Sequence, residues 1–263
     1  MWRLNMKVAC ISDLHLATDD FADSFQHKED SFLHFLDHLE GHYDQIVLNG
    51  DIYDPCKSLR FGQYEDQLYQ IQEKYSKLTD RFIQANYIQI AGNHDYTLEK
   101  LGYADHYSFK GEDGTKYIFF HGHQLDGLRS GKPLFIFLTA FANWLEKLGW
   151  KNAEAHLSWI GERLGTLIHA DAGGILSSKA EDVFSGDDNQ RVIVMGHSHE
   201  PPVKVEFKNN VYLNSGACVR KRIEYVHIDT LEREYSTRSW SETNRFGIAT
   251  KTNYTSLGET KNA

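Results

Sequence analysis

Cysteine is scarce in this chain, with three residues, Cys10, Cys56 and Cys218, among 263. They do not form the C-x-x-C spacing that is typical of thiolate zinc sites and thiol redox motifs. Three cysteines also cannot build the disulfide framework of a small secreted domain. We therefore expect a protein of a reducing compartment, the cytoplasm.

Long apolar runs are missing as well. No run approaches the roughly 20 consecutive apolar residues that a membrane-spanning helix needs. The first six residues, Met1 to Met6, lack the apolar core and the small-residue cleavage site of a signal peptide. We expect a soluble protein, for which peripheral contact with the inner face of a membrane stays open.

Basic residues are fewer than acidic ones, 28 against 37, which gives a formal net charge of −9. Proteins that grip nucleic acid over a broad surface are normally basic there. The composition therefore carries no strong nucleic-acid signature, and only the short run from Arg220 to Arg222 suggests a local basic groove.

A hydrophobic content of 41% is present, which is enough for a sizeable core. Residues 31–39 and 59–85 have the apolar spacing of amphipathic helices. Residues 222–229 and 232–239 alternate as an antiparallel strand pair, and 203–207 and 211–214 predict a hairpin around Asn209-Asn210. This mixture favours one α/β domain that carries an insertion.

Metal-ligand types of side chain stand in five short blocks, each just after an apolar run that predicts a strand. The runs are residues 8–11, 46–48, 87–90, 117–120 and 192–195. The blocks are Asp13-Leu14-His15, Asn49-Gly50-Asp51, Gly92-Asn93-His94-Asp95, His121-Gly122-His123 and Gly196-His197-Ser198-His199. Because α/β sheets place their sites at the carboxyl ends of strands, we expect these side chains to converge on one metal site.

Imidazole, carboxylate and amide groups without sulfur suit Mn²⁺, Fe or Zn²⁺ better than Ca²⁺. Any single Asp or His is more often a surface or capping residue. The coincidence of five blocks, each after a strand-like run, outweighs that interpretation here.

The order of these blocks, D-x-H, G-D, G-N-H-D, H and G-H-x-H, resembles the calcineurin-like metallophosphoesterase superfamily from about Lys7 to about Asp229. The resemblance implies an α/β fold, a sandwich of mixed β-sheets flanked by helices, with a helical insertion as a cap. It also implies two divalent metal ions, with Mn²⁺ preferred and Fe or Zn²⁺ as alternatives. By this resemblance Asp13, His15 and His199 would bind the first ion, Asp51 would bridge, and Asn93, His121 and His197 would bind the second.

The same resemblance implies two-metal-dependent phosphoester hydrolysis, in which a metal-bridging hydroxide attacks phosphorus. His94 does not coordinate in this family and would act as a general acid or transition-state stabiliser that assists the leaving group. Asp95 is expected to accept a hydrogen bond from the His94 imidazole and hold it in place. Asp54 is expected to bond the loop backbone instead.

Between residues 127 and 188 the ligand pattern is absent, although the segment from Leu134 to Leu145 is apolar on every side. We expect residues 1–126 and 189–240 to form the metallophosphoesterase domain, residues 127–188 a helical cap, and residues 241–263 a mobile polar tail. The apolar segment predicts an ordinary buried helix, an acyl-chain or membrane contact, or a homodimer interface.

The insertion and the block His121-Gly122-x-x-Leu125 resemble UDP-2,3-diacylglucosamine pyrophosphatases of lipid A biosynthesis, which commonly carry Arg in place of His94. The expected substrate is a UDP-sugar lipid-type pyrophosphate or another small phosphodiester. A nuclease of the same superfamily is one alternative. A non-catalytic metal-fold scaffold for protein assembly is another, although such members have usually lost ligands and none is missing here.

Overall fold

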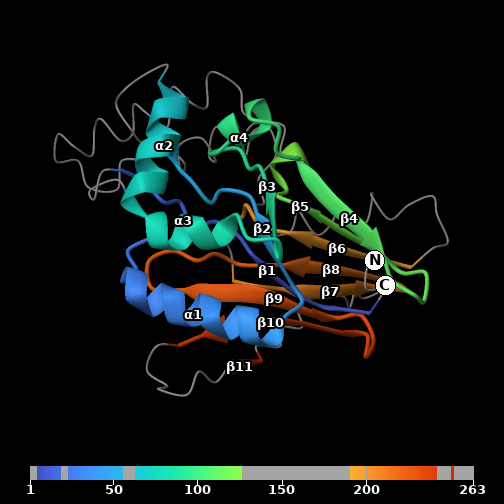
Figure 1. Ribbon diagram of the computed structural model, residues 1–263. Helices are drawn as coiled ribbons and strands as arrows, with labels where there is room; N and C mark the ends of the chain where they lie inside the picture. Colours follow the sequence, from blue (N-terminus) through green and yellow to red (C-terminus); the bar gives the residue numbers. More distant parts are fainter. Residues whose placement is uncertain are drawn as a thin grey trace, which may run out of the picture.

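The computed structural model describes residues 5–18, 23–55, 63–125, 190–199, 201–241 and 250–251. Within these ranges the chain forms two β-sheets, and helices cover one face of the first sheet (Figure 1). The predicted insertion at 127–188, with the segment from Leu134 to Leu145, lies outside the described residues. The lipid-contact and dimer interpretations of that segment therefore stay predictions.

The first sheet has six strands in the order β11-β10-β9-β1-β2-β3. In this sheet β1, β2 and β3 are parallel, whereas β9, β10 and β11 are each antiparallel to their neighbours. The strands are β1 (Lys7–Ile11), β2 (Gln45–Asn49), β3 (Tyr87–Ile90), β9 (Ile223–Asp229), β10 (Glu234–Trp240) and β11 (Thr250–Lys251). The pairing of β11 with β10 gives two residues of the expected tail a place in the sheet.

The second sheet has five strands in the order β4-β5-β6-β8-β7. Its central strands β5, β6 and β8 are parallel, and the edge strands β4 and β7 are antiparallel to their neighbours. The strands are β4 (His106–Lys110), β5 (Lys116–Phe120), β6 (Arg191–Met195), β7 (Lys204–Phe207) and β8 (Asn210–Asn214). The predicted fold class, a sandwich of mixed sheets flanked by helices, is confirmed.

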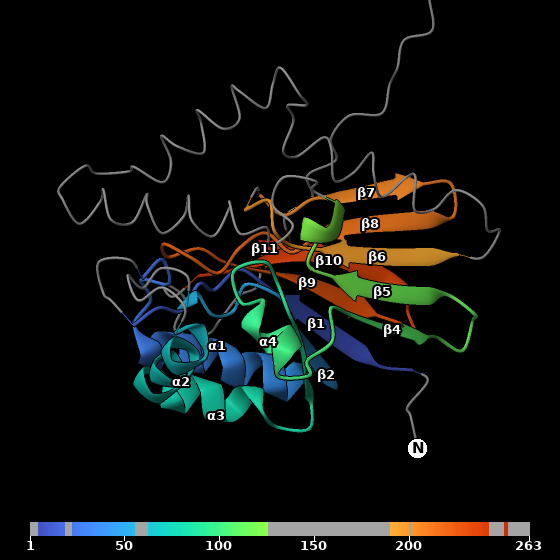
Figure 2. The same cartoon turned by 90° about the horizontal axis from the view of Figure 1, so that it is seen from above.

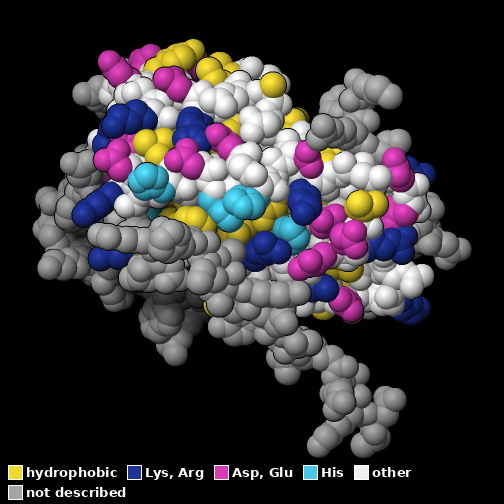
Figure 3. All heavy atoms as spheres, turned by 60° about the horizontal axis from the view of Figure 1, so that its bottom comes forward, with side chains coloured by type: hydrophobic (Ala, Val, Ile, Leu, Met, Phe, Trp, Pro, Cys, Tyr) yellow, Lys and Arg dark blue, Asp and Glu magenta, His cyan; other side chains and the backbone are white. Residues whose placement is uncertain are grey.

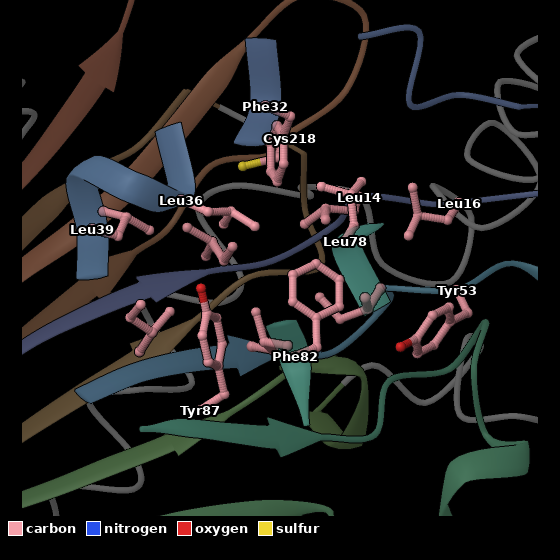
Figure 4. Packing of buried hydrophobic residues seen from close by; sticks show 14 of the residues in the cluster. Leu14, Leu16, Phe32, Leu36, Leu39, Tyr53, Leu78, Phe82, Tyr87 and Cys218 are labelled. Atoms are coloured by element: carbon pink, nitrogen blue, oxygen red, sulfur yellow. The ribbon is translucent and has the colours of Figure 1, made fainter. Parts of the chain in front are cut away.

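The sheets pack face to face because their strands are apolar on both sides. Val8 and Cys10 of β1 belong to the core between the sheets, whereas Ala9 and Ile11 face the helices. Figure 2 shows α1 (Glu29–His42), α2 (Tyr64–Lys74) and α3 (Ser76–Phe82) on the side of the first sheet away from the second. Figure 4 shows the core beneath them, where Phe32, Leu36 and Phe82 meet. This packing holds β1 and β2 rigidly, and both deliver side chains to the site below.

The single long helix predicted for residues 59–85 is wrong, because α2 ends at Lys74 and α3 begins at Ser76. Between them Tyr75 has a non-helical backbone, with φ −108° and ψ 35°. Its hydroxyl donates to the Asp23 carboxylate, and the Thr79 hydroxyl donates to the Gln72 carbonyl at 3.0 Å across the break. A contact with a loop 52 residues away in the sequence thus outweighs a continuous helical pattern.

The β7–β8 hairpin turns at Lys208 and Asn209, one residue earlier than predicted, because Asn210 already pairs with Phe207. Within the described residues no helix is long and apolar enough to cross a membrane. With the lower side of Figure 1 turned forward, the described surface carries interspersed basic and acidic side chains (Figure 3).

One buried histidine that lies away from the predicted site makes the stability of the protein depend on pH. His227 lies on β9, and its Nδ1 is 3.0 Å from the Tyr43 hydroxyl oxygen. Burial, reinforced by the Arg238 guanidinium, lowers the pKa of His227 to about 4. The unfolded chain, with a histidine pKa of about 6.5, binds more protons between these values. The stabilising contribution of neutral His227 is therefore present above about pH 6.5 and lost as the pH falls towards 4.

We expect His227→Gln to weaken this dependence. The urea midpoint of the wild-type protein should fall more than that of the variant between about pH 7 and about pH 4.5. His34→Gln, at an exposed position of α1, is the control and should follow the wild-type curve. Parallel curves for wild type and His227→Gln would contradict the assignment.

Candidate metal centre

The five predicted blocks follow five strands whose carboxyl ends meet at one end of the sandwich. β1, β2 and β3 are parallel in the first sheet, and β5 and β6 are parallel in the second. The sheets are joined at this end by the β2–β5 contact, in which His121 Nδ1 lies 2.8 Å from the Asn49 carbonyl oxygen. The Asn49 side chain donates back to the Phe120 carbonyl at 3.0 Å. These bonds bring side chains from both sheets into one site.

The backbone turns sharply as it leaves the strands. Left-handed φ values between 50° and 70° occur at Asp13, His15, Asp51, His197 and His199. Residues with a Cβ pay roughly 1–2 kcal/mol for this conformation, so it persists only where surrounding contacts impose it. The turns direct consecutive ligand-type side chains to one side of the loop, and this was not visible from strand periodicity.

A first group consists of Asp13, His15 and His199. Asp13 Oδ1 lies 3.0 Å from His199 Nε2 and 3.9 Å from His15 Nε2. The two Nε2 atoms are 2.9 Å apart. Three donor atoms this close together can face one cation.

A second group consists of Asp51, His121 and His197, whose donor atoms all lie within 4.8 Å of one another. Asp51 Oδ2 is 3.0 Å from His121 Nε2 and 3.9 Å from His15 Nε2. Asp51 therefore lies between the two groups. A carboxylate in this position can serve two ions at once.

One buried polar atom of the site, Oδ1 of Asn93, makes no hydrogen bond with a described residue. A buried polar atom without a partner is costly, and native proteins normally satisfy it with a protein group, water or an ion. Oδ1 of Asp13 lies 3.0 Å from His199 Nε2, and Nε2 of His121 lies 3.0 Å from Asp51 Oδ2. Oxygen and imidazole nitrogen atoms gathered in this way fit a pair of divalent cations of the Mn²⁺, Fe or Zn²⁺ type.

The ionisation of the carboxylates also fits a cation site. Burial alone would raise the pKa of Asp13, but the imidazoles of His199 and His121 outweigh burial and lower it to about 2. Burial is likewise outweighed at Asp51, where His121 and His94 hold the pKa well below its usual range. Both carboxylates are therefore charged at neutral pH and are able to bind cations.

Glycine is required where the loops approach these side chains. Gly50 has a φ of +86°, and a Cβ there would lie 2.6 Å from the His121 ring. A Cβ on Gly92 would overlap the Asp51 carboxylate. The glycines of the predicted blocks thus make room for the ligand-type side chains of neighbouring strands.

Asp54 is the site residue that sequence reasoning missed. Its Oδ2 lies 3.0 Å from Nδ1 of His15 and 3.1 Å from Nδ1 of His94. When both rings donate through Nδ1, the Nε2 atom of each ring points away from Asp54. In His15 this directs Nε2 towards the first group. Its position three residues after Asp51 was the only signal in the sequence.

Asp95 does not have the expected role of holding His94. Its carboxylate accepts backbone N–H groups of Gly92 at 2.5 Å and Ile52 at 2.8 Å, and of Asp51 and Tyr53 at 3.3 Å. Burial and the nearby Asp51 charge raise the pKa of Asp95 to about 7. Asp95 therefore ties the loop after β3 to the loop after β2, and Asp54 contacts His94 in its place.

His123, which the sequence left outside the ligand set, is buried next to the second group. Its ring centroid is 5.6 Å from that of His121 and 6.3 Å from that of His197. It begins the short 3-10 helix His123–Leu125. His106 is exposed on β4, and His156 and His169 lie outside the described residues.

Solved structures share a partial likeness with the chain. A predicted phosphoesterase from Streptococcus pneumoniae TIGR4 is 14% identical, with 94% of this chain and 98% of that chain covered and a TM-score of 0.41. Vps29 of Entamoeba histolytica, solved with Zn²⁺, is 14% identical, with 94% of this chain and 98% of that chain covered and a TM-score of 0.46. An archaeal phosphodiesterase is 16% identical, with 89% of this chain and 99% of that chain covered and a TM-score of 0.45.

No curated protein sequence matches the chain significantly. A family model does match, and its description is calcineurin-like phosphoesterase. This match supports a metal-dependent phosphoester hydrolase, in agreement with the clusters of metal-ligand side chains. Because the match extends over residues 6–201, more than half of the 263 residues, the chain belongs to the calcineurin-like phosphoesterase family.

Proposed function

We propose that this protein hydrolyses small phosphodiesters or pyrophosphates with a pair of divalent metal ions. The proposal rests chiefly on one observation: Asp13, His15 and His199 form one group, and Asp51, His121 and His197 an adjacent one, in which the donor atoms lie close enough together to hold a metal ion. The first ion would be held by Asp13, His15 and His199, the second by Asn93, His121 and His197, and both by Asp51.

Phosphate esters resist hydrolysis because their oxygens repel an incoming nucleophile and the alkoxide leaves poorly. Divalent ions bound here would neutralise phosphoryl charge and lower the pKa of a water molecule. The protein contributes the arrangement of the donors. Asp54 accepts from Nδ1 of His15, which keeps Nε2 of that ring available as a donor atom at the first group.

His94 is the residue that we assign to proton transfer. Its Nδ1 is oriented by Asp54 at 3.1 Å, and its backbone N–H donates to Oδ1 of Asp51 at 2.8 Å. The ring is therefore fixed beside the carboxylate that lies between the two metal groups. From there Nε2 can donate to a phosphoryl or leaving-group oxygen, an effect worth roughly a hundredfold to ten-thousandfold.

The substrate proposal follows from the same residue. The UDP-2,3-diacylglucosamine pyrophosphatases that the layout resembles commonly carry Arg where this chain has His94. A histidine can protonate a leaving group, which an arginine with a pKa above about 12 cannot do. We therefore favour a general phosphodiesterase or pyrophosphatase over the lipid A enzyme.

The test is metal-dependent hydrolysis of bis-p-nitrophenyl phosphate, a generic aryl phosphodiester. We expect chelator-treated protein to be inactive and Mn²⁺ to restore turnover, with Zn²⁺, Mg²⁺ and Fe²⁺ assayed in parallel. Full activity after complete removal of metal would contradict the proposal. Absence of turnover with all four metals, in protein that binds them, would favour a scaffold instead.

A further inference from the structure

The segment between β8 and β9 contains a turn with an unusual sequence. The Arg222 N–H donates to the Val219 carbonyl at 2.9 Å, which closes a four-residue β-turn. Both central residues are left-handed, with φ 52° at Arg220 and 71° at Lys221. Positive φ at both central positions is the mark of a type I′ turn, which favours Asn-Gly. Among the described residues no other pair of consecutive non-glycine residues has positive φ.

Local backbone energetics do not account for Arg and Lys at these positions. A residue with a Cβ is disfavoured in the left-handed region, and long side chains bring no compensation from burial here because both are exposed. Two strained residues in succession are a reason to look for a function of their side chains, because such strain clusters at functional sites. The functional property of Arg220 and Lys221 is their positive charge.

The turn is attached to the metal centre at both ends. On one side the Cys218 N–H donates to the Asp13 carbonyl at 3.2 Å. On the other side the Arg222 guanidinium donates to the His199 carbonyl at 3.1 Å. Arg220 follows Cys218 by two residues, so their Cα atoms are at most about 7.6 Å apart. The turn is therefore tied to the backbone of two residues of the first metal group, Asp13 and His199.

The three basic residues have different surroundings. Arg222 is engaged, since its guanidinium also lies 3.7 Å from the Glu224 carboxylate. Arg220 and Lys221 make no ion pair with any described residue. In a protein with a net charge of −9, these two exposed cations lie on a turn that is hydrogen-bonded to the loops of the first metal group, where the proposed function places a phosphate.

We propose that Arg220 and Lys221 bind a second phosphate of the substrate, adjacent to the phosphate that is cleaved. This inference rests on the proposed function and narrows it to esters with neighbouring phosphates. The second phosphate belongs either to a pyrophosphate diester or to the next nucleotide of a single strand. Arg provides a fork of donors for such a group and Lys a mobile point charge.

The experiment compares substrates with one and two phosphates in a double variant, Arg220→Asn with Lys221→Gly. We measure kcat/KM with Mn²⁺ for bis-p-nitrophenyl phosphate, for UDP-glucose and for a short single-stranded oligonucleotide. We expect the ratio of kcat/KM for the preferred two-phosphate substrate to that for the aryl diester to fall about tenfold or more. Which ratio falls, that for UDP-glucose or that for the oligonucleotide, identifies the source of the second phosphate.

A measurement of stability separates charge from structure. Because Asn-Gly suits the turn, the double variant should melt at the same temperature as the wild type or higher. Lys208→Gly is the matched control, because Lys208 is an exposed left-handed residue with φ 51° in the β7–β8 turn. That turn lies at the amino end of β6, where Arg191 N–H bonds Asn210, opposite the site. Lys208→Gly should leave unchanged the ratio of kcat/KM for the preferred two-phosphate substrate to kcat/KM for the aryl diester.

The inference and the proposed function can fail separately. Unaltered ratios for both two-phosphate substrates overturn the inference, as does a lowered melting temperature with an equal loss on every substrate. If the wild type hydrolyses none of the three, the proposed function fails, and binding of UMP and UDP by calorimetry decides the inference. The affinity gain from UMP to UDP should then shrink in the double variant, and an undiminished gain overturns the inference.

Discussion

Asp51→Asn should lower kcat for bis-p-nitrophenyl phosphate by roughly a hundredfold to a thousandfold. This estimate is that for removing one group that stabilises transition-state charge, about 2.7–4 kcal/mol, at about 1.36 kcal/mol per factor of ten in rate. Asp51 Oδ2 lies 3.0 Å from His121 Nε2 and 3.9 Å from His15 Nε2, between the two metal groups. Asparagine keeps the size of the side chain and removes the charge that two ions would share.

Metal content should fall together with the rate. We expect elemental analysis of the Asp51→Asn protein to find less Mn²⁺ per chain than in the wild type after equal loading. Asp80→Asn, at an exposed position of α3, is the matched control and should keep both rate and metal. An Asp51→Asn protein with nearly wild-type turnover would remove the shared-carboxylate assignment. A scaffold would be indicated by a different result: the wild type shows no turnover, and the wild type and the Asp51→Asn protein perform equally in a protein-assembly assay.

His94→Gln should lower kcat by roughly a hundredfold to ten-thousandfold while metal content stays close to that of the wild type. The ring of His94 is oriented by Asp54 and does not belong to either metal group in the assignment. The loss should be larger for an alkyl ester than for a p-nitrophenyl ester, because p-nitrophenolate leaves without a proton. This difference between leaving groups distinguishes a proton donor from a residue that only shapes the site.

Asp54→Asn provides the companion test for His94. Asp54 orients both His94 and His15, so its loss should weaken metal affinity about 10–100-fold in addition to slowing the reaction. His106→Gln, at an exposed position on β4, serves as the control for both variants. The proton-donor role is refuted if the His94→Gln protein loses the same factor on alkyl and aryl esters.

Much of the fold could be predicted because local sequence and global structure agree at the strands that carry the site. The runs at 8–11, 46–48, 87–90, 117–120 and 192–195 appear as β1, β2, β3, β5 and β6. The runs of β1, β2 and β6 are apolar at successive positions because both of their faces are buried, as Val192 and Ile193 of β6 illustrate. An uninterrupted apolar run that ends in Gly, Asp or His is therefore readable without any knowledge of its neighbours.

The helix between 59 and 85 could not be predicted in the same way. Its apolar spacing continues across Tyr75, yet the backbone is non-helical there, and the Tyr75 hydroxyl donates to the distant Asp23 carboxylate. Helix propensity is a weak preference that one tertiary contact can override. Such a contact leaves no trace in the periodicity of the segment.

The sequence by itself determined which strands exist, in which order they present donor groups, and that these groups are oxygen and imidazole ligands. Only the tertiary structure decided which carboxylate serves which partner. Asp54 contacts His94, and Asp95 instead binds backbone N–H groups of the loop after β2. The reason is that residue types and strand ends are local properties of the chain. A contact between residues 40 positions apart, such as that of His94 with Asp54, depends on how the loops after β2 and β3 pack together.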